Sequence, residues 1–267
     1  MIGSVLKAID VLEVFTAHEP RLSLAEISRR LGLPRSTTHN LLKTLHSRNL
    51  LEKVDSDHYA LGPALIGLSP AVRVNVEIRD RSAPLLRELA DACRESVYLT
   101  IPDGDQILYI YALESPRRLL ARSAVGDRFP YHCTAVGKAM LAFFPPATTA
   151  DILDRLGLPA MSPSTITDRG VLEAELAQTR QRGYATDAGE NNPNIFCMGA
   201  PILDAQGRVV AASSISGADP EILNSRRPDL ARRLVLAAEE ISRRMGYVPA
   251  SPSQVSYARL GDNSHLP

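Results

Sequence analysis

The sequence is poor in cysteine and contains no long apolar run. Its 267 residues include only three cysteines, Cys93, Cys133 and Cys197, with no C-x-x-C pair. A small odd number fits a reducing compartment better than a disulfide framework, so we expect free thiols. Charges interrupt the apolar runs well short of the roughly 18 residues that a membrane span needs, and residues 1–10 lack the features of a signal peptide. The sequence therefore predicts a cytoplasmic protein that does not cross a membrane.

The chain also lacks a net charge, because 30 basic residues balance 30 acidic ones. Hydrophobic residues make up 45% of the chain and charged residues 22%, which is close to the globular average. This composition excludes a fibrous or largely disordered protein. The length fits one large domain or two moderate ones, and our hypothesis is two.

Acidic residues are absent between Glu26 and Glu52, so a neutral chain carries one basic segment. Such a segment is either the solvated face of a helix or an electrostatic contact with nucleic acid. The basic side chains in this window are Arg29, Arg30, Arg35, Lys43 and Arg48, and His39 and His46 lie among them.

The first 50 residues are predicted to form three short helices. Residues 4–15 carry one apolar stripe at helical spacing: Val5, Ile9, Leu12 and Phe15. Residues 23–26 match a capping box, which begins a second helix that ends at Gly32. Pro34 opens a third helix that runs to about Arg48.

A β-hairpin is predicted after the third helix, over residues 51–54 and 59–61, because the turn-forming residues 55–58 separate two extended runs. Two helices joined by a tight turn and followed by a hairpin form a winged helix-turn-helix. Arg and Asn side chains at the start of the third helix are suited to guanine and adenine, while hydroxyl groups and lysines hold phosphates. The predicted DNA-binding residues are Arg35, Ser36, Thr37, Thr38, His39, Asn40, Lys43 and Lys53.

Short sequence runs in both halves of the chain carry a family resemblance. The N-terminal runs are LSLAEI at 22–27 and LGLPRST at 31–37; the C-terminal runs are PYHCTAVGKA at 130–139, GYATD at 183–187, EN at 190–191 and CMGAPI at 197–202. In this order and spacing, residues 4 to about 248 resemble the IclR family of bacterial transcriptional regulators.

The resemblance implies an α+β protein with a winged helix-turn-helix domain over 1–62, a linker helix over 63–78 that carries dimer contacts, and a GAF-like effector-binding domain over 79–248 with a mainly antiparallel sheet. Residues 249–267 have no periodicity, and we expect them to be disordered. A DNA-binding dimer, or a dimer of dimers, implies a pseudo-palindromic operator. Whether the protein activates or represses is open.

Two features of the second domain suggest a site for a small anion. Thr134 is a good N-cap, and the next three residues are small or compact, so the first backbone N–H groups of that helix can bind a carboxylate. On the predicted strand 209–216, Val210, Ala212, Ser214 and Ser216 are expected to share one face. A plain structural cap and an exposed strand face are the alternative interpretations.

The resemblance implies a ligand pocket on these same elements. Family members bind small metabolites, often carboxylates or aromatic acids. Carried over residue by residue, the ligand contacts are Ala121, Phe129, Ala135, Val136, Asp187, Ile195, Cys197, Ser214 and Ser216.

Other functions are less favoured by the sequence. Adjacent residues on an extended chain point to opposite faces, so His132 and Cys133 make a poor catalytic dyad. A metal-responsive regulator using His132, Cys133 and Cys197 is an alternative, although metal-binding spacing is absent. A helix-turn-helix that serves protein assembly is a third possibility. We therefore expect a regulator without catalytic residues, metal or cofactor.

Overall fold

The structure, a computed structural model, describes residues 1–16, 19–68, 76–115 and 125–248. It divides into two compact units, Met1–Val76 and Glu77–Pro267. Among the helices that it describes, none is both long and apolar enough to cross a membrane.

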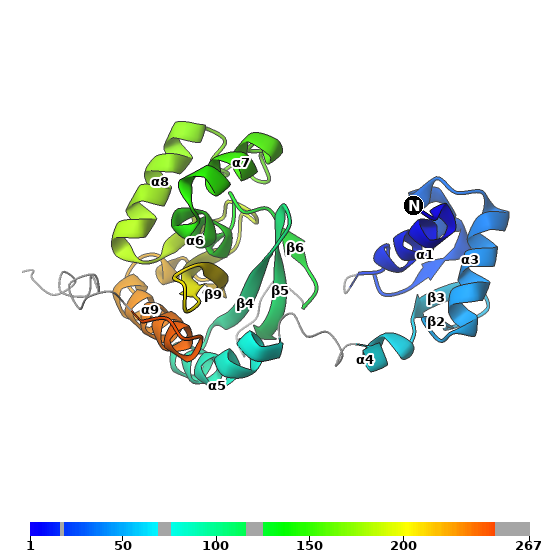
Figure 1. Cartoon of the computed structure of the whole chain (residues 1–267), viewed down its shortest axis with the longest axis horizontal. Helices are drawn as coiled ribbons and strands as arrows, with labels where there is room; N and C mark the ends of the chain where they lie inside the picture. Colours follow the sequence, from blue (N-terminus) through cyan, green and yellow to red (C-terminus); the bar gives the residue numbers. More distant parts are fainter. Residues whose placement is uncertain (17–18, 69–75, 116–124, 249–267) are drawn as a thin grey trace, which may run out of the picture. The chain divides into compact units, whose positions relative to one another are not determined.

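The first unit is a winged helix-turn-helix (Figure 1). A small antiparallel sheet has the order β1-β3-β2; β1 lies between α1 and α2 in the chain, and β2 and β3 follow α3. The sequence predicted the β2–β3 hairpin but missed β1, whose two residues pair with β3. The elements are α1 (Gly3–Glu13), β1 (Leu22–Ser23), α2 (Leu24–Leu31), α3 (Arg35–Ser47), β2 (Leu51–Lys53), β3 (His58–Leu61) and α4 (Ala64–Leu68).

The predicted capping box at the start of α2 is confirmed. The Glu26 backbone N–H donates to Ser23 Oγ, and the Ser23 backbone N–H donates to the Glu26 carboxylate over 2.8 Å. At the other end of the helix, Gly32 has a φ of +61°, a left-handed conformation that glycine adopts without strain. The turn is tight, and α3 begins at Arg35, three residues after Gly32.

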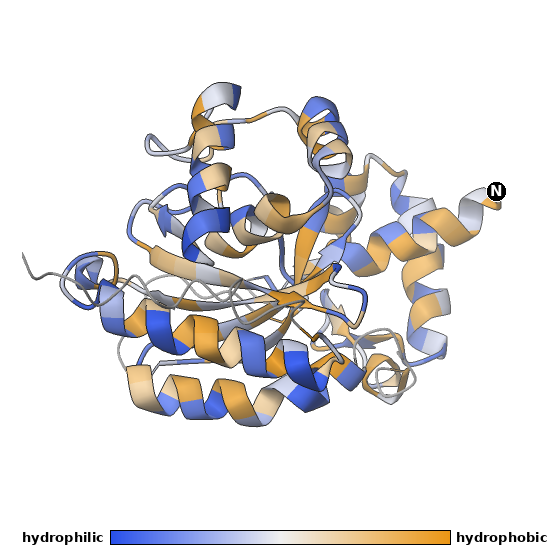
Figure 2. Ribbon diagram, turned by 60° about the vertical axis from the view of Figure 1, so that its left-hand side comes forward, coloured by the Kyte–Doolittle hydropathy of each residue, from blue (hydrophilic) through white to orange (hydrophobic). Residues whose placement is uncertain are grey.

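The buried face of α1 differs from the predicted stripe. Val11 and Phe15 pack into the core of this unit beside Ile27 and Leu42, but Val5 and Ile9 are exposed. The helix is apolar on more than one side, so the spacing did not identify the inward side. Orange segments along the helix that begins at the N label show this in Figure 2.

The second unit is built on a six-stranded sheet in which every neighbouring pair is antiparallel, with the order β6-β5-β4-β9-β8-β7. The predicted mainly antiparallel α+β fold is confirmed, although neither β6 nor β7 was predicted as a strand. The elements are α5 (Val76–Cys93), β4 (Ser96–Asp103), β5 (Gln106–Leu113), β6 (Arg128–Phe129), α6 (Ala135–Phe143), α7 (Pro146–Leu156), α8 (Arg169–Arg182), β7 (Ala185–Ala188), β8 (Phe196–Leu203), β9 (Val209–Gly217), η2 (Pro220–Ile222) and α9 (Arg227–Arg244).

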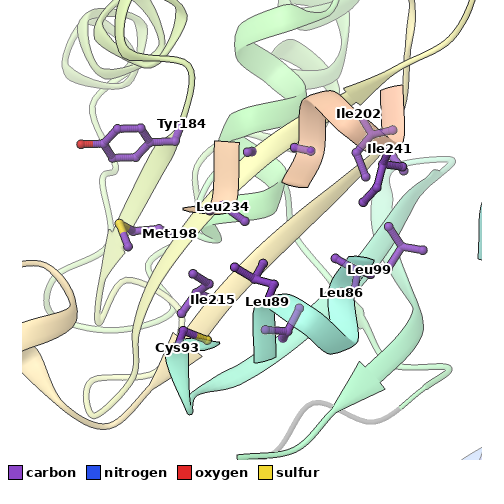
Figure 3. Packing of buried hydrophobic residues seen from close by; sticks show 14 of the residues in the cluster. Leu86, Leu89, Cys93, Leu99, Tyr184, Met198, Ile202, Ile215, Leu234 and Ile241 are labelled. Carbon is purple, nitrogen blue, oxygen red and sulfur yellow. The ribbon is translucent and has the colours of Figure 1, made fainter. Parts of the chain in front are cut away.

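Each face of this sheet is covered by helices. Helices α5 and α9 cover one face, where Leu86 and Leu234 pack against Leu99 and Ile215 (Figure 3). Helices α6, α7 and α8 lie on the other side (Figure 1), where Met140 and Leu172 belong to the second apolar cluster. The candidate site lies on this second face, beneath the start of α6.

The prediction that Val210 shares one face of β9 with Ala212, Ser214 and Ser216 is wrong. Val210 packs with the α5 and α9 cluster, whereas Ala212 belongs to the cluster beneath α6. The cause is a register shift between β8 and β9, where Ile202 pairs with Ala211 and Leu203 pairs with Val209. One extra residue in this bulge reverses the side on which Val210 emerges.

Two predicted segments lie partly or wholly outside the described residues. Within the predicted linker helix over 63–78, Ala64–Leu68 is helical, and Val76–Ile78 belongs to α5. Residues 69–75 and the tail 249–267 are not described.

Candidate functional site

The first candidate surface is the exposed side of α3. Arg35, Ser36, His39, Asn40 and Lys43 are all exposed there, and none of them belongs to the core of the unit. Their positions follow from the sequence, because Leu41, Leu42 and Leu45 hold the opposite side of the helix against α1 and α2. Four of these five side chains lie in the first two turns of α3, which is where a recognition helix reads bases.

Thr38 is a correction to the predicted DNA-binding set. Its side chain is fully buried, and its hydroxyl group donates to the backbone carbonyl of Pro34. The helical period places it on the inner side of α3, outside the exposed arc that holds Arg35, His39 and Lys43. Thr37 is partly buried, so it lies at the border of the surface.

One arginine of the basic segment between Glu26 and Glu52 is paired with an acidic side chain in the structure, so the segment offers less positive charge than the sequence indicated. Arg30 makes two hydrogen bonds of 2.8 Å to the Glu19 carboxylate, which neutralises its charge. Arg29 and Arg48 remain exposed. The charge available to phosphates therefore comes from α3 and its ends more than from α2.

The turn of the hairpin carries negative charge. Asp55 accepts hydrogen bonds from the backbone N–H groups of Asp57 and His58, each over 2.9 Å. These bonds, together with the nearby His58 ring, lower the pKa of Asp55 to about 2. Lys53 lies exposed on β2, just before this turn. The wing therefore carries a basic residue on its first strand and an acidic turn at its tip.

The second candidate site begins with a row of polar residues across the sheet of the second unit. Asp187 pairs with Cys197, Cys197 pairs with Ser216, and Ser216 pairs with Ser96. Directly paired residues in antiparallel strands point to the same face, so all four lie on one side. Ser214, two residues before Ser216, pairs with Gly199 and Tyr98 and lies on that side as well. The structure thus brings together Asp187, Cys197, Ser214 and Ser216, as predicted.

Helix α6 begins directly above this row. Thr134 caps it, since its hydroxyl oxygen accepts from the backbone N–H of Gly137 over 3.1 Å. A side chain at Gly199 would come within 2.5–2.7 Å of the backbone of Ala135 and Val136, so only glycine allows β8 to lie this close. Ala135 and Val136 are therefore held at the start of a buried helix, beside the polar row.

A buried ion pair lies beside the row. Lys138 Nζ on α6 contacts Glu190 Oε1 at 2.5 Å, and both side chains are nearly inaccessible to solvent. The other carboxylate oxygen of Glu190 is buried with no hydrogen-bond partner among the described residues. Burial raises the pKa of Glu190, against the attraction of the Lys138 ammonium group.

Among the titratable groups of the site, Asp187 has a pKa that is raised close to neutral pH. Burial raises its pKa to about 7, although the backbone N–H of Glu190 donates to its carboxyl group over 2.6 Å. The charge of Glu190 also raises this pKa, and the charge of Lys138 lowers it. The site therefore changes charge near neutral pH.

The cysteines do not support the catalytic alternative. Burial raises the pKa of Cys133 to about 12 and raises that of Cys197 as well, so both thiols stay protonated and are poor nucleophiles. His132 is buried, and its Nε2 lies 2.9 Å from the Pro159 carbonyl oxygen, so this ring nitrogen has a hydrogen-bond partner in the protein.

Metal binding by His132, Cys133 and Cys197 also lacks support. Cys133 Sγ lies 3.7 Å from Asn191 Oδ1, and Cys197 lies against Ser216. Across the described ranges, no three His, Cys, Asp or Glu side chains form a group that could hold a metal ion.

Aromatic rings border the row at the other end of the sheet. The ring centroids of Phe129 and Tyr109 are 5.5 Å apart, and those of Tyr109 and Tyr98 are 5.4 Å apart, both in edge-to-face geometry. Phe129 is thus joined to the row through Tyr98, the register partner of Ser214. Ile195 is partly buried in the loop before β8. Ala121, predicted as a ligand contact, lies outside the described residues.

Lys138, Glu190 and Tyr98 belong to this site but were not predicted as site residues. Lys138 and Glu190 do stand in two of the runs that carry the family resemblance, and a lysine inside an apolar helix start indicates a buried partner. Tyr98 had no such signal, because only the strand register shows that it neighbours Ser214.

Comparisons with known proteins agree with both units. The IclR helix-turn-helix domain model matches residues 4–55, and the model described as bacterial transcriptional regulator IclR C-terminal matches residues 71–243. The HTH-type transcriptional regulator XynR of Escherichia coli is 32% identical over 248 residues, which cover 92% of this chain and 98% of that protein. BhcR of Paracoccus denitrificans is 33% identical over 238 residues, covering 88% of this chain and 85% of that protein.

Solved structures agree as well. The crystal structure of Thermotoga maritima IclR superposes with a TM-score of 0.76 at 30% identity, covering 92% of this chain and 100% of that one. An IclR homologue from Microbacterium hydrocarbonoxydans, crystallised with 4-hydroxybenzoate, has a TM-score of 0.80 at 24% identity, covering 91% of this chain and 98% of that one.

The fold is therefore that of a DNA-binding regulator with a separate ligand-binding unit. This chain belongs to the IclR family of bacterial transcriptional regulators, which are not enzymes.

Proposed function

We propose that this chain binds an operator sequence-specifically and that a small carboxylate or aromatic acid, bound in the C-terminal unit, changes its operator affinity. The observation that carries the ligand part is the register of the sheet, which aligns Asp187, Cys197 and Ser216 beside the buried start of α6. Polar groups that converge on one point inside an apolar surround are typical of small-molecule sites.

The start of α6 supports an acidic ligand. Backbone N–H groups in the first turn of a helix have no partner within it, and the helix dipole adds partial positive charge there. Thr134 satisfies only the N–H of Gly137, and Ala135 and Val136 are nearly inaccessible to solvent. A carboxylate placed there would accept from their N–H groups, while Ser214 and Ser216 donate from the strand.

The aromatic rings beside Ser214 support an aromatic body on that acid. Tyr98, Tyr109 and Phe129 form a chain of edge-to-face contacts that ends at the polar row. A ligand ring can extend this arrangement. The complex of the Microbacterium homologue with 4-hydroxybenzoate is consistent with this, because it indicates that the fold can accommodate an aromatic acid.

Helix α3 supports base reading by the first unit. Arg35 and Asn40 are exposed on its outer side, where Arg can make paired hydrogen bonds to guanine and Asn to adenine. Lys43, one turn further on, is suited to a phosphate, which fixes position without reading sequence.

The exposed apolar side of α1 supports a homodimer. Ile2, Val5, Leu6 and Ile9 are between 43% and 70% exposed. Contiguous exposed apolar residues mark interaction surfaces, and a helix-turn-helix reads two half-sites only as a dimer. We propose a homodimer, or a dimer of dimers, on a pseudo-palindromic operator.

The test begins with selection of a preferred duplex from a random library by the full chain. On that duplex and on random DNA, Arg35→Ala and Asn40→Ala should abolish the preference, each base contact being worth about 1–3 kcal/mol. Lys43→Ala should weaken both duplexes alike and reduce the salt dependence.

Asp57→Ala, at the acidic turn of the wing, is the matched surface control and should retain the preference. Equal losses on specific and random DNA for all three α3 variants would overturn base reading by α3. Affinity that does not fall as salt rises would instead indicate a protein-assembly role.

A further inference from the structure

A cavity of about 170 Å³ lies where α8, β8 and α9 meet in the second unit. Strand β7 pairs only with Phe196–Gly199, so the second half of β8, Ala200–Leu203, runs past it. On that side, Gly183 and Tyr184 lead the chain from α8 into β7. The residues lining the cavity include none of the predicted effector contacts. It is therefore separate from the polar row beneath α6.

The walls of this cavity are mainly apolar. They come from the sheet, from α9 and from the end of α6, and the apolar lining residues are Phe143, Ala200, Pro201, Leu203, Ala231, Val235 and Ala238. An apolar cavity of about 150 Å³ is large enough for benzene. The volume here thus fits one small ring or a short branched chain.

The rim of the cavity carries several charged side chains. The lining residues include three arginines, Arg180, Arg182 and Arg232, and one carboxylate, that of Glu239. A ligand with an apolar body would enter between these charges, and its head group would be recognised by a charge that has no ion-pair partner.

Two of these arginines are already paired. Arg182 Nη2 donates to the Glu175 carboxylate over 2.5 Å, and its guanidinium group lies 5.0 Å from the centroid of the Tyr184 ring. Arg232 makes a longer ion pair of 3.3 Å with Asp229. These partners hold Arg182 and Arg232 at the rim.

Arg180 is the arginine with unused donors. Its Nε donates to the backbone carbonyl of Ala142, and it makes no ion pair within the described part of the chain. A guanidinium group has five N–H donors, so the four on its terminal nitrogens remain for a ligand. Arg180 is also exposed, and a planar carboxylate can approach it in paired geometry.

We propose that this cavity is a second ligand site, for a small carboxylate with an apolar body, in which Arg180 binds the carboxylate and Val235 and Ala238 contact the body. The proposal does not depend on the effector site beneath α6. Charge complementarity with Arg180 and the volume of the cavity define the ligand class.

The experiment uses tryptophan fluorescence, since the chain contains no tryptophan. Tyr247 lines the cavity and is partly exposed, so Tyr247→Trp places a single reporter there. Titration of the full chain with 4-nitrobenzoate, which quenches indole on contact, should give saturable quenching. Adding Arg180→Ala should weaken binding at least tenfold, whereas Arg243→Ala, an exposed arginine of α9 outside the cavity, should leave it unchanged. Nitrobenzene, which lacks the carboxylate, should bind at least tenfold more weakly.

Three results would overturn the proposal. These are quenching that rises linearly without saturation, quenching abolished by Ser214→Ala but not by Arg180→Ala, and quenching that saturates only after residues 249–267 are removed. The second result would place the probe in the effector site, and the third would identify the chain's own tail as the occupant. Saturation-transfer NMR of benzoate with Ser214→Ala and with Ser214→Ala/Arg180→Ala gives the same comparison without the reporter, with the effector site weakened in both proteins. An equal signal from both proteins would contradict the assignment.

Discussion

The thiol sulfur of Cys197 lies 2.9 Å from the hydroxyl oxygen of Ser216, its register partner on the neighbouring strand. The two side chains form the centre of the polar row that runs from Asp187 on β7 to Ser96 on β4. The contact orients the Ser216 hydroxyl on the face beneath α6, where the proposed effector would bind.

Removing that hydroxyl should weaken effector binding more than it weakens the fold. Ser216→Ala leaves Cys197 without its partner and should lower effector affinity by about 1 kcal/mol, close to a fivefold change. Isothermal titration with the acid identified by screening measures it. Ser213→Ala is the matched control, since Ser213 points to the opposite face and its buried hydroxyl has no partner among the described residues. Equal effects of the two substitutions would argue against a ligand contact at Ser216.

Removing one member of the buried Lys138–Glu190 ion pair should destabilise the folded protein more than removing both. Lys138→Met leaves the Glu190 carboxylate buried and uncompensated, and such losses typically cost about 3–5 kcal/mol. Urea denaturation followed by circular dichroism should show this loss. The double variant Lys138→Met with Glu190→Leu should be more stable than Lys138→Met alone. If it is less stable than either single variant, the two charges do not act as a pair.

Stability should fall as pH rises from about 4 to about 7, because burial raises the pKa of Asp187 from 3.8 to about 7. In this range the unfolded chain releases a proton that folded Asp187 retains, so the contribution is full below pH 4 and lost by pH 7. Asp187→Asn should flatten this part of the stability profile. Asp151→Asn, which alters an exposed carboxylate on α7, should leave it unchanged. A slope that survives in Asp187→Asn would assign the titration elsewhere.

Effector affinity should fall above about pH 7 for the same reason. Ionised Asp187 would repel a bound carboxylate, and the Lys138 charge is already taken by Glu190. Titrations at pH 6 and pH 8 should therefore differ for the unsubstituted chain and agree for Asp187→Asn. Affinity that rises with pH in the unsubstituted chain would contradict an anionic ligand beside Asp187.

The capping box at Ser23 should stabilise the first unit measurably. Ser23→Ala removes the acceptor for the Glu26 N–H and should cost about 1 kcal/mol, seen as faster hydrogen exchange in α2. Ser56→Ala in the hairpin turn is an exposed control that should leave exchange in α2 unchanged. Unchanged exchange in Ser23→Ala would mean that tertiary packing alone holds the start of α2.

Local signals in the sequence were sufficient for most of the elements. The capping box at Ser23, the glycine at position 32 and the N-cap at Thr134 each determine a helix end through a few adjacent atoms, and the structure shows all three. Family resemblance then gave the arrangement of those elements, because motif order and spacing report a whole fold.

Contacts between residues far apart in the sequence were harder to predict from the sequence. Whether Val5 or Val11 faces the core depends on what packs against α1, and the bulge that moves Val210 depends on the partner strand. The Lys138–Glu190 pair and the position of Tyr98 beside Ser214 likewise join residues far apart in sequence. Such contacts follow from register and packing, which the helical and strand periods do not specify.

Reciprocal coupling between the two ligands follows from the proposed function. If the acid changes operator affinity by some factor, the operator must change the affinity for the acid by the same factor. Titration of the acid with and without saturating operator duplex measures that factor from the second side. Unequal factors in the two directions would mean that the acid and the operator do not bind one and the same species.

The most direct test is a thermal-shift screen of small carboxylates and aromatic acids against the unsubstituted chain and Ser214→Ala. An acid at a hundred times its dissociation constant should stabilise the folded protein by about 2.7 kcal/mol. The account predicts that at least one acid raises the melting temperature and that the same concentration of that acid gives a smaller rise in Ser214→Ala. No shift with any acid, together with a shift from zinc or from a neutral compound, would contradict the anion site beneath α6.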